Sequence, residues 1–321
     1  MTRPRIFCFH RLPDATSRRL EDRFEVVWGG EPATPVADLL EIGTRFDALV
    51  PTVTDPVPAA VFAVPGRRFG IVANYGVGYD LIDVAAARRA GVAVTNTPGV
   101  LTDCTADLTL ALILMTMRRL TEGERLLRQG EWTGWRPTHH LGRRVTGAVL
   151  GIVGMGRIGQ AVAARAKHGF AMQVRYTSRT RLAPEAEAAL GLEWGSVDDL
   201  MAGSDIVSLH CPATAETTGL IDARRLALMR PGAVLINTAR GSLVDEAALE
   251  VALRTGRIGG AGLDVFRGEP TIPRGFLDLP NVTMLPHLGS ATEETRNAMG
   301  MAMAANLDAY FAGRPLPSPV G

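Results

Sequence analysis

The chain has 321 residues, enough for one large or two ordinary domains, and its 34 Lys and Arg residues nearly balance 33 Asp and Glu residues. With no basic surplus and no block of like charge, the sequence gives no sign of a nucleic-acid partner. A hydrophobic content of 46% and a charged content of 21% are typical of a soluble globular protein.

The cysteines and the apolar runs indicate a cytoplasmic protein. Cys8, Cys104 and Cys211 are odd in number, far apart and without metal-ligand spacing, which favours a reduced, intracellular chain without a metal. The run Ile6–Phe9 is too short for a signal peptide. The run Leu108–Met117 is too short to cross a bilayer, so we expect no membrane partner.

Short apolar strands alternate with helical segments over residues 5–98, which predicts a first parallel, doubly wound α/β unit. The helical stretches include Ala15–Arg23 and Val84–Ala90, the second of which is stopped by Gly91. The predicted strands are rich in β-branched and aromatic residues: Arg5–Phe9, Phe24–Trp28, Asp47–Val50, Ile71–Asn74 and Val92–Thr95.

A long helix and an irregular arm follow this unit. One helical pattern runs from Thr105 to Arg128, and its apolar first half is expected to pack against a sheet. The segment Gly130–Gly142 contains Trp132 and Trp135 without clear periodicity. It fits an arm that lines a pocket or a subunit contact, and it fits a packed surface loop equally well.

The stretch Val149–Gln160 reads VLGIVGMGRIGQ, an apolar strand followed by a glycine-rich loop and a helix start. Gly154 permits a tight turn, Gly156 lets the backbone approach a pyrophosphate, and Gly159 lets helix and strand pack closely. The helix N-terminus offers N–H groups to the phosphates. With 35 glycines in the chain the pattern alone is weak, and a tight turn without a ligand is the alternative. The strand and helix on either side favour a dinucleotide-binding loop.

Six strands with intervening helical segments are predicted from residue 149 onward, the number expected of two mononucleotide-binding halves. The last segment, Thr292–Phe311, reads as one amphipathic helix that can return to the first unit. The predicted strands are Val149–Val153, Met172–Tyr176, Asp205–Leu209, Ala233–Asn237, Gly259–Val265 and Val282–Leu285.

Polar residues follow the ends of these strands, where ligands bind in an open doubly wound sheet. Anion-binding and proton-transferring types are among them, and they come from independent loops. The convergence therefore predicts an active site at this edge. After the glycine loop, the residues are Ser178, Arg179 and Thr180; His210, Cys211 and Pro212; Thr238 to Gly241; Asp264 and Glu269; and Pro286 and His287.

Each of these residues also has a structural interpretation. Arg240 could simply be a solvent-exposed surface residue, but its small neighbours favour close approach of the backbone to a ligand. His287 could be a structural histidine, although an acidic partner would make it a general acid. Glu269 could be a loop charge, and His210 is ambiguous. Cys211 has the size of a small packing residue.

The segment after the second of these strands predicts the cofactor. An NAD-specific site usually carries an Asp or Glu there, which binds the ribose 2′-OH. Residues 174–180 contain no acid but offer Arg179 and two hydroxyls, and Arg181 follows. Because Arg can pair with a 2′-phosphate, we expect NADP(H) in preference to NAD(H), with NAD(H) as the alternative.

The chain resembles the D-isomer-specific 2-hydroxyacid dehydrogenases, particularly the glyoxylate/hydroxypyruvate reductases. The resemblance runs from about Asn74 to Thr292, whereas the first 70 residues match only in pattern. Several motifs occur in the family's order. They are residues 74–80 (NYGVGYD), 101–107 (LTDCTAD), 154–159, 209–212 (LHCP), 237–241 (NTARG), 262–266 (GLDVF) with 269–270 (EP), and 286–292 (PHLGSAT).

The resemblance implies a role for each catalytic residue. Arg240 would bind the substrate carboxylate and polarise the carbonyl, His287 would protonate the carbonyl oxygen, and Glu269 would orient that histidine. The backbone N–H groups of Val77 and Gly78 would form a second carboxylate clamp. The cofactor-binding set would comprise Thr105, Gly154, Gly156, Arg157, Ile158, Gly159, Ser178, Arg179, Thr180, Cys211, Pro212, Thr238, Asp264 (as partner of the nicotinamide carboxamide), His287 and Gly289.

The resemblance also implies a two-domain fold: a Rossmann-type NAD(P)-binding domain and a flavodoxin-like substrate domain that close over a cleft between them. We expect the substrate domain at residues 1–98 and 288–321 and the cofactor domain at 99–287. A homodimer formed through the cofactor domain is expected, and the arm at Trp132–Trp135 could reach the partner subunit.

The predicted function is NADPH-dependent reduction of small 2-oxo acids, with glyoxylate or hydroxypyruvate first. One rival is a dehydrogenase for a larger 2-oxo acid such as phenylpyruvate or 2-oxoisocaproate. The walls of such a pocket could include Pro51–Thr54 and Trp135. The other rival is a cofactor-sensing regulator of the same fold, which the intact Arg, Glu and His set disfavours.

Overall fold

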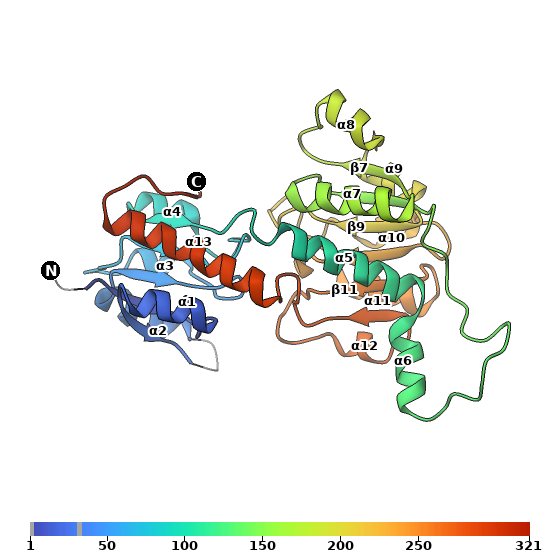
Figure 1. Cartoon of the computed structure of the whole chain (residues 1–321), viewed down its shortest axis with the longest axis horizontal. Coiled ribbons are helices and arrows are strands. Elements are labelled where there is room, and N and C mark those ends of the chain that lie inside the picture. Colours follow the sequence, from blue (N-terminus) through green and yellow to red (C-terminus); the bar gives the residue numbers. More distant parts are fainter. Residues whose placement is uncertain (1–2, 31–33) are drawn as a thin grey trace. The chain divides into compact units, whose positions relative to one another are not determined.

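The protein is described by a computed structural model for residues 3–30 and 34–321. The chain divides into two compact units: unit 1 comprises Met1–Leu101 and Ala291–Gly321, and unit 2 comprises Thr102–Ser290 (Figure 1). Over the described residues, each unit is built on one parallel sheet. None of the helices in this part of the chain has the length and apolar character needed to traverse a bilayer.

The five-stranded sheet of unit 1 has the order β2-β1-β3-β4-β5, with every pair parallel. This is the flavodoxin-like order, with its switch point between β1 and β3. All five predicted strands of the first unit are confirmed, with ends within one residue of those expected. The strands are β1 (Arg5–Cys8), β2 (Glu25–Trp28), β3 (Ala48–Val50), β4 (Ile71–Ala73) and β5 (Ala93–Thr95).

Helices cover this sheet. The long helix α13 packs against α1 and β4, and it buries Met299, Met303 and Leu307. The predicted single helix after Thr292 is therefore confirmed, and it lies on the five-stranded sheet (Figure 1). The helices of unit 1 are α1 (Asp14–Glu21), α2 (Val36–Arg45), α3 (Ala59–Phe62), α4 (Val84–Arg89) and α13 (Glu293–Phe311).

The sheet of unit 2 has seven parallel strands in the order β12-β11-β10-β9-β6-β7-β8. It contains the Rossmann order, which reverses between β6 and β9. The sequence predicted six strands, and the one it missed is the short edge strand β8 beside β7. The strands are β6 (Val149–Val153), β7 (Gln173–Thr177), β8 (Leu192–Trp194), β9 (Ile206–Leu209), β10 (Val234–Asn237), β11 (Gly260–Leu263) and β12 (Val282–Met284).

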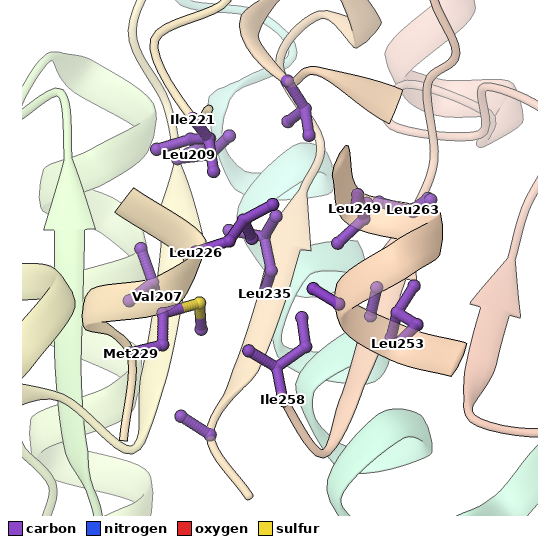
Figure 2. Close-up of a cluster of buried hydrophobic side chains, with 14 of the residues drawn as sticks. Val207, Leu209, Ile221, Leu226, Met229, Leu235, Leu249, Leu253, Ile258 and Leu263 are labelled. Carbon is purple, nitrogen blue, oxygen red and sulfur yellow. The ribbon is translucent and has the colours of Figure 1, made fainter. Parts of the chain in front are cut away.

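Hydrophobic clusters on both faces hold this sheet between helices. Figure 2 shows one of them: side chains of α10 and α11, such as Leu226 and Leu249, point toward Val207, Leu235 and Leu263 on the strands. On the opposite face, α5 and α7 bury side chains against the alternate residues of the same strands. Burial on both faces explains why these strands read as continuous apolar runs.

Three helices of unit 2 begin at polar N-caps, as when Asp245 accepts a hydrogen bond from the Ala248 N–H at 3.0 Å. The helices of unit 2 are α5 (Thr102–Met117), α6 (Leu120–Arg128), α7 (Arg157–Phe170), α8 (Pro184–Leu190), α9 (Val197–Gly203), α10 (Ala223–Leu228), the 3₁₀ turn η1 (Gly241–Leu243), α11 (Glu246–Arg254) and α12 (Arg274–Leu277).

The helix predicted from Thr105 to Arg128 is wrong in its continuity. Arg119 takes a left-handed conformation with φ of 54°, which ends α5 and starts α6 in a new direction. His140 contacts the Arg119 carbonyl with its Nε2 at 2.8 Å, so the arm is tied to this break. Figure 1 shows the arm after α6 as a long loop that extends away from the sheet of unit 2.

Candidate active site

The glycine loop lies between β6 and α7, and its three glycines have different surroundings. Gly154 has φ of 101°, and a Cβ there would lie 2.5 Å from the Cys211 nitrogen. A Cβ on Gly159 would lie 2.2 Å from the Gly154 carbonyl oxygen. Close packing therefore requires glycine at both positions. A Cβ on Gly156, the N-cap of α7, would meet nothing within 4 Å, so this helix N-terminus is open to a phosphate.

Arg157 and Ile158 form the first turn of α7, and Ser178, Arg179 and Thr180 follow β7. The Ser178 hydroxyl donates to the Thr180 carbonyl, which closes a small turn and leaves Arg179 exposed. No acidic residue lies within this turn.

Arg181, the second cation near this turn, is held by Glu187. Its Nε and Nη2 donate to the two carboxylate oxygens of Glu187, each at 2.8 Å. Hydrogen bonds from Arg181 and then from Tyr176 lower the pKa of Glu187 to about 2. Arg181 is therefore engaged within the protein, whereas Arg179 is exposed and lies within electrostatic range of Glu216.

The loop after β9 brings His210, Cys211 and Pro212 beside the glycine loop. His210 Nε2 contacts the Ser208 hydroxyl at 2.8 Å, and burial lowers the pKa of His210 to about 4. Burial also raises the pKa of the Cys211 thiol to about 11. Both side chains are thus neutral at pH 7, which suits packing at the sheet edge better than acid–base chemistry.

The loop after β10 carries Thr238 and Arg240 and is shaped by Asn237. The buried Asn237 side chain accepts from the Ala239 N–H at 3.0 Å and donates to the Arg240 carbonyl at 2.8 Å. The Thr238 hydroxyl lies 3.0 Å from that of Thr109 on α5. Sequence reasoning did not single out Asn237, although an Asn at a strand end is a common turn-forming signal.

Gly241 lets this loop approach the turn that carries Glu269. A Cβ on Gly241 would lie 2.0 Å from the Phe266 carbonyl carbon, so only glycine allows the two backbones to pass. Arg240 Nη1 donates to the Ala239 carbonyl at 2.8 Å, and the Arg240 charge helps to lower the pKa of Glu269. The structure thus places the charge of Arg240 within electrostatic range of Glu269.

His287 and Glu269 form a hydrogen-bonded pair, with 2.7 Å between His287 Nδ1 and Glu269 Oε2. The other oxygen of Glu269 accepts from the Phe266 N–H at 2.9 Å. Burial acts to raise the pKa of Glu269, but the hydrogen bonds from His287 and Phe266 and the nearby positive charges outweigh it, so this pKa is lowered. Glu269 is therefore a carboxylate at neutral pH, and Nε2 is the His287 nitrogen that is not bonded to it.

Asp264 holds the loop that carries His287. Its side chain is fully buried, and its two oxygens accept from the N–H groups of Leu288 and Gly289 at 2.7 and 2.8 Å. Burial raises the pKa of Asp264 to about 6. Thr105 at the start of α5 adds a hydrogen bond to the Gly289 carbonyl at 2.9 Å. Asp264 thus acts on this loop, a contact that the expected nicotinamide role did not include.

Val77 and Gly78 lie in unit 1, in the loop between β4 and α4, and both are half-buried. Side-chain amides of Asn74 and Asn96 hold the carbonyl oxygens of this loop. Sequence reasoning named neither amide as a site residue. Across residues 3–30 and 34–321, the structure has no group of three or more His, Cys, Asp or Glu side chains suited to hold a metal ion.

The arrangement in unit 2 can carry out a defined chemistry. The loops after four strands of one sheet, β6, β10, β11 and β12, carry an open helix N-terminus, an arginine, and a histidine paired with a charged carboxylate. A group of this kind can bind an anion and donate a proton beside a dinucleotide.

Comparisons with known proteins identify the family of the chain. Residues 110–289 match the profile of the D-isomer specific 2-hydroxyacid dehydrogenase, NAD binding domain. The chain is 46% identical to a glyoxylate reductase of Thermococcus litoralis, over 98% of this chain and 96% of that protein. It is 47% identical to a glyoxylate reductase of Thermococcus kodakarensis, over 98% and 96%.

A solved structure is similar throughout. It is the NADPH-dependent glyoxylate/hydroxypyruvate reductase of Sinorhizobium meliloti in complex with NADP and malonate, with a TM-score of 0.87 and 38% identity over 100% of this chain and 97% of that one. By its sequence, its two parallel sheets and these relatives, the chain belongs to the D-isomer-specific 2-hydroxyacid dehydrogenase family and is an NAD(P)-dependent oxidoreductase acting on a CH–OH group.

Proposed function

We propose that the protein reduces glyoxylate and hydroxypyruvate to glycolate and D-glycerate with NADPH. The observation that carries this proposal is the 2.7 Å hydrogen bond between His287 and Glu269 within electrostatic range of Arg240. This set matches a small anionic substrate whose carbonyl must gain a proton. The relatives that carry the name glyoxylate reductase support the choice of substrate.

The residues of unit 2 fit a nicotinamide dinucleotide. The open backbone at Gly156 would hold the pyrophosphate, Arg179 with Ser178 and Thr180 the adenosine end, and Thr238 and Asp264 the region near His287. When bound, such a cofactor supplies the hydride. Thr105, Cys211, Pro212 and Gly289 would complete the pocket, as the resemblance implies.

His287 acts as the general acid in this proposal. Its Nε2 carries the proton that passes to the carbonyl oxygen of the substrate, because Nδ1 is bonded to Glu269. The Glu269 carboxylate fixes the orientation of the imidazole through its contact with Nδ1. Arg240 binds the substrate carboxylate and stabilises charge that develops on the oxygen. The resemblance implies that the N–H groups of Val77 and Gly78 in unit 1 also bind a substrate carboxylate.

A panel of 2-oxo acids tests the proposal. NADPH oxidation should be fastest, by kcat/KM, with glyoxylate or hydroxypyruvate. A preference for phenylpyruvate or 2-oxoisocaproate would instead assign a larger substrate. Absence of turnover with every member, together with NADPH-dependent binding of a protein partner, would indicate a cofactor-sensing regulator.

Arg179 is proposed to select NADPH. Replacing it with Ala should raise KM for NADPH about 10-fold and leave KM for NADH nearly unchanged, because only the 2′-phosphate loses its cation. Steady-state kinetics with both cofactors measure this.

Arg181→Ala is the matched control for this prediction. It removes an arginine two residues away that is bonded to Glu187, so it should lower thermal stability without changing the ratio of the two kcat/KM values. A wild-type protein that prefers NADH would contradict the assignment.

A homodimer formed through unit 2 is also proposed. Trp132 and Trp135 are 52% and 80% exposed, and Leu127 and Leu141 beside them are 59% and 65% exposed. Exposed apolar groups of this size on one helix and its adjoining arm are typical of an interaction surface. Light scattering should give about twice the chain mass of 34.3 kDa, and Trp135→Ser should shift the protein toward the monomer. A wild-type monomer would contradict this proposal.

Finally, we propose a cytoplasmic location. Cys8, Cys104 and Cys211 all remain thiols in the structure, which suits a reducing compartment.

A further inference from the structure

The loop Gly76–Gly78 in unit 1 has all three of its carbonyl oxygens bound from within the protein. Asn74 Nδ2 donates to the Gly76 carbonyl at 3.0 Å and to the Gly78 carbonyl at 2.8 Å. Asn96 Nδ2 donates to the Val77 carbonyl at 2.9 Å. Only the NH₂ end of an amide can donate to a carbonyl, so these contacts also settle the orientation of both side chains.

The N–H groups of the same loop are in the opposite situation. Over the described part of the chain, the N–H groups of Gly76, Val77 and Gly78 donate to no protein acceptor. Val77 and Gly78 are both half-buried. Consecutive N–H groups without protein partners are suited to bind an anion.

We propose that Asn74 and Asn96 are positioning residues that turn the N–H groups of Val77 and Gly78 toward the substrate carboxylate. The inference rests on the proposed function, in which those N–H groups bind the carboxylate. A peptide unit is planar, so holding a carbonyl on one side directs the following N–H to the other. Asn74 and Asn96 fix three consecutive peptide units in this way.

The Asn96 side is connected to the C-terminal segment that follows α13. The Ser318 hydroxyl donates to the Asn96 carbonyl at 2.6 Å, and the Asn96 N–H donates to the Ser318 carbonyl at 3.3 Å. Ser318 is itself held by the fully buried Asn306 of α13, through contacts of 2.9 and 3.1 Å. The position of Asn96, and through it of the Val77 peptide, therefore depends on the returning segment.

Asn74 is buried at the end of β4 and is bound to the end of β5. Its side chain is 1% exposed, and its backbone N–H donates to the Thr95 carbonyl at 2.9 Å. The backbone of the adjoining residue, Tyr75, donates to the Pro51 carbonyl at 2.8 Å. The loop is thus fastened at β4 by one amide and at the end of β5 by the other.

The test is Asn96→Ala, because Asn96 is only half-buried and its loss should leave unit 1 folded. KM for glyoxylate is expected to rise about 10-fold, the effect of misaligning one charged hydrogen bond, with kcat changed less than about 3-fold. KM for NADPH should not change. The dissociation constant of oxamate, an unreactive analogue with the same carboxylate, should rise by the same factor in the presence of cofactor.

Two further variants separate positioning from general stability. Ser318→Ala removes the hydroxyl that donates to the Asn96 carbonyl and keeps the backbone bond from the Asn96 N–H, so it should raise KM for glyoxylate by a smaller factor, about 3-fold. Ser17→Ala removes a buried hydroxyl that donates to the Leu12 carbonyl at 2.8 Å in the same unit. Like Ser318→Ala, it loses one hydrogen bond from a serine hydroxyl to a backbone carbonyl, but it leaves the contacts of the loop Gly76–Gly78 unchanged. It should leave KM and oxamate binding unchanged.

The outcomes distinguish the two proposals. If the wild-type protein reduces no 2-oxo acid, the proposed function fails and this inference falls with it. If the wild-type protein does so, and Asn96→Ala keeps KM and oxamate binding within about twofold, the positioning role alone is overturned. Should Asn96→Ala not fold, Asn96→Asp keeps the side-chain size, and an unchanged KM in that variant would overturn the inference equally.

Discussion

Replacing His287 with Asn is expected to lower kcat for glyoxylate by about 10²- to 10⁴-fold, the range that general acid catalysis contributes. The variant loses the imidazole proton. Its backbone conformation should be kept, because His287 has φ of 54° and Asn tolerates this left-handed region. An Asn amide can also still donate to Glu269. Steady-state kinetics with NADPH measure the loss.

The binding of NADPH and the melting temperature should both stay near the wild-type values in this variant. His168, an exposed histidine near the end of α7 in the same unit, provides the control. His168→Asn should retain full activity. A His287→Asn variant with unchanged kcat would refute the role of His287 as the acid.

Replacing Arg240 with Lys should lower kcat/KM for glyoxylate by about 10²-fold. Lys keeps the charge but loses the planar fork that pairs with a carboxylate through two hydrogen bonds. The loop itself should persist, because Asn237 holds the backbone carbonyl of residue 240 and not its side chain. Kinetics over a range of glyoxylate concentrations would show the effect.

Arg225→Lys is the matched control for Arg240→Lys. Arg225 also forms two side-chain hydrogen bonds, to Asp198 at 2.9 Å and to the Leu220 carbonyl at 2.7 Å. Its replacement should lower stability modestly and leave kcat/KM unchanged. If Arg240→Lys also left kcat/KM for glyoxylate unchanged, Arg240 would not be the residue that binds the substrate carboxylate.

Much of the fold is readable from the sequence because parallel strands buried on both faces leave long apolar runs. The strand β8 escaped because it has only three residues, Leu192–Trp194, and lies at the sheet edge with two of them exposed. The break between α5 and α6 escaped for a different reason. A non-glycine residue in the left-handed region, here Arg119, leaves no compositional signal, and the helical pattern continues through it.

The candidate site divides in the same way. Arg240, Glu269 and His287 could be named because residue type and position after a strand reveal chemistry. Asn237 and Asn74 could not, because their contribution is a hydrogen bond to a backbone group whose direction depends on the folded loop. The sequence offered Arg181 as a second cation for the cofactor, and only the structure shows that Glu187 already binds it.

The loops at the carboxyl ends of the unit 2 strands hold one another in place through close backbone contacts. A Cβ at Gly154 would collide with Cys211, one at Gly241 would collide with Phe266, and the Asp264 side chain binds the N–H of Gly289. This arrangement restricts how the protein can diverge. Exposed side chains on these loops can be exchanged with little effect, whereas an inserted or deleted residue would displace the neighbouring loop as well. Attempts to re-engineer this edge should therefore substitute residues and keep every loop at its present length.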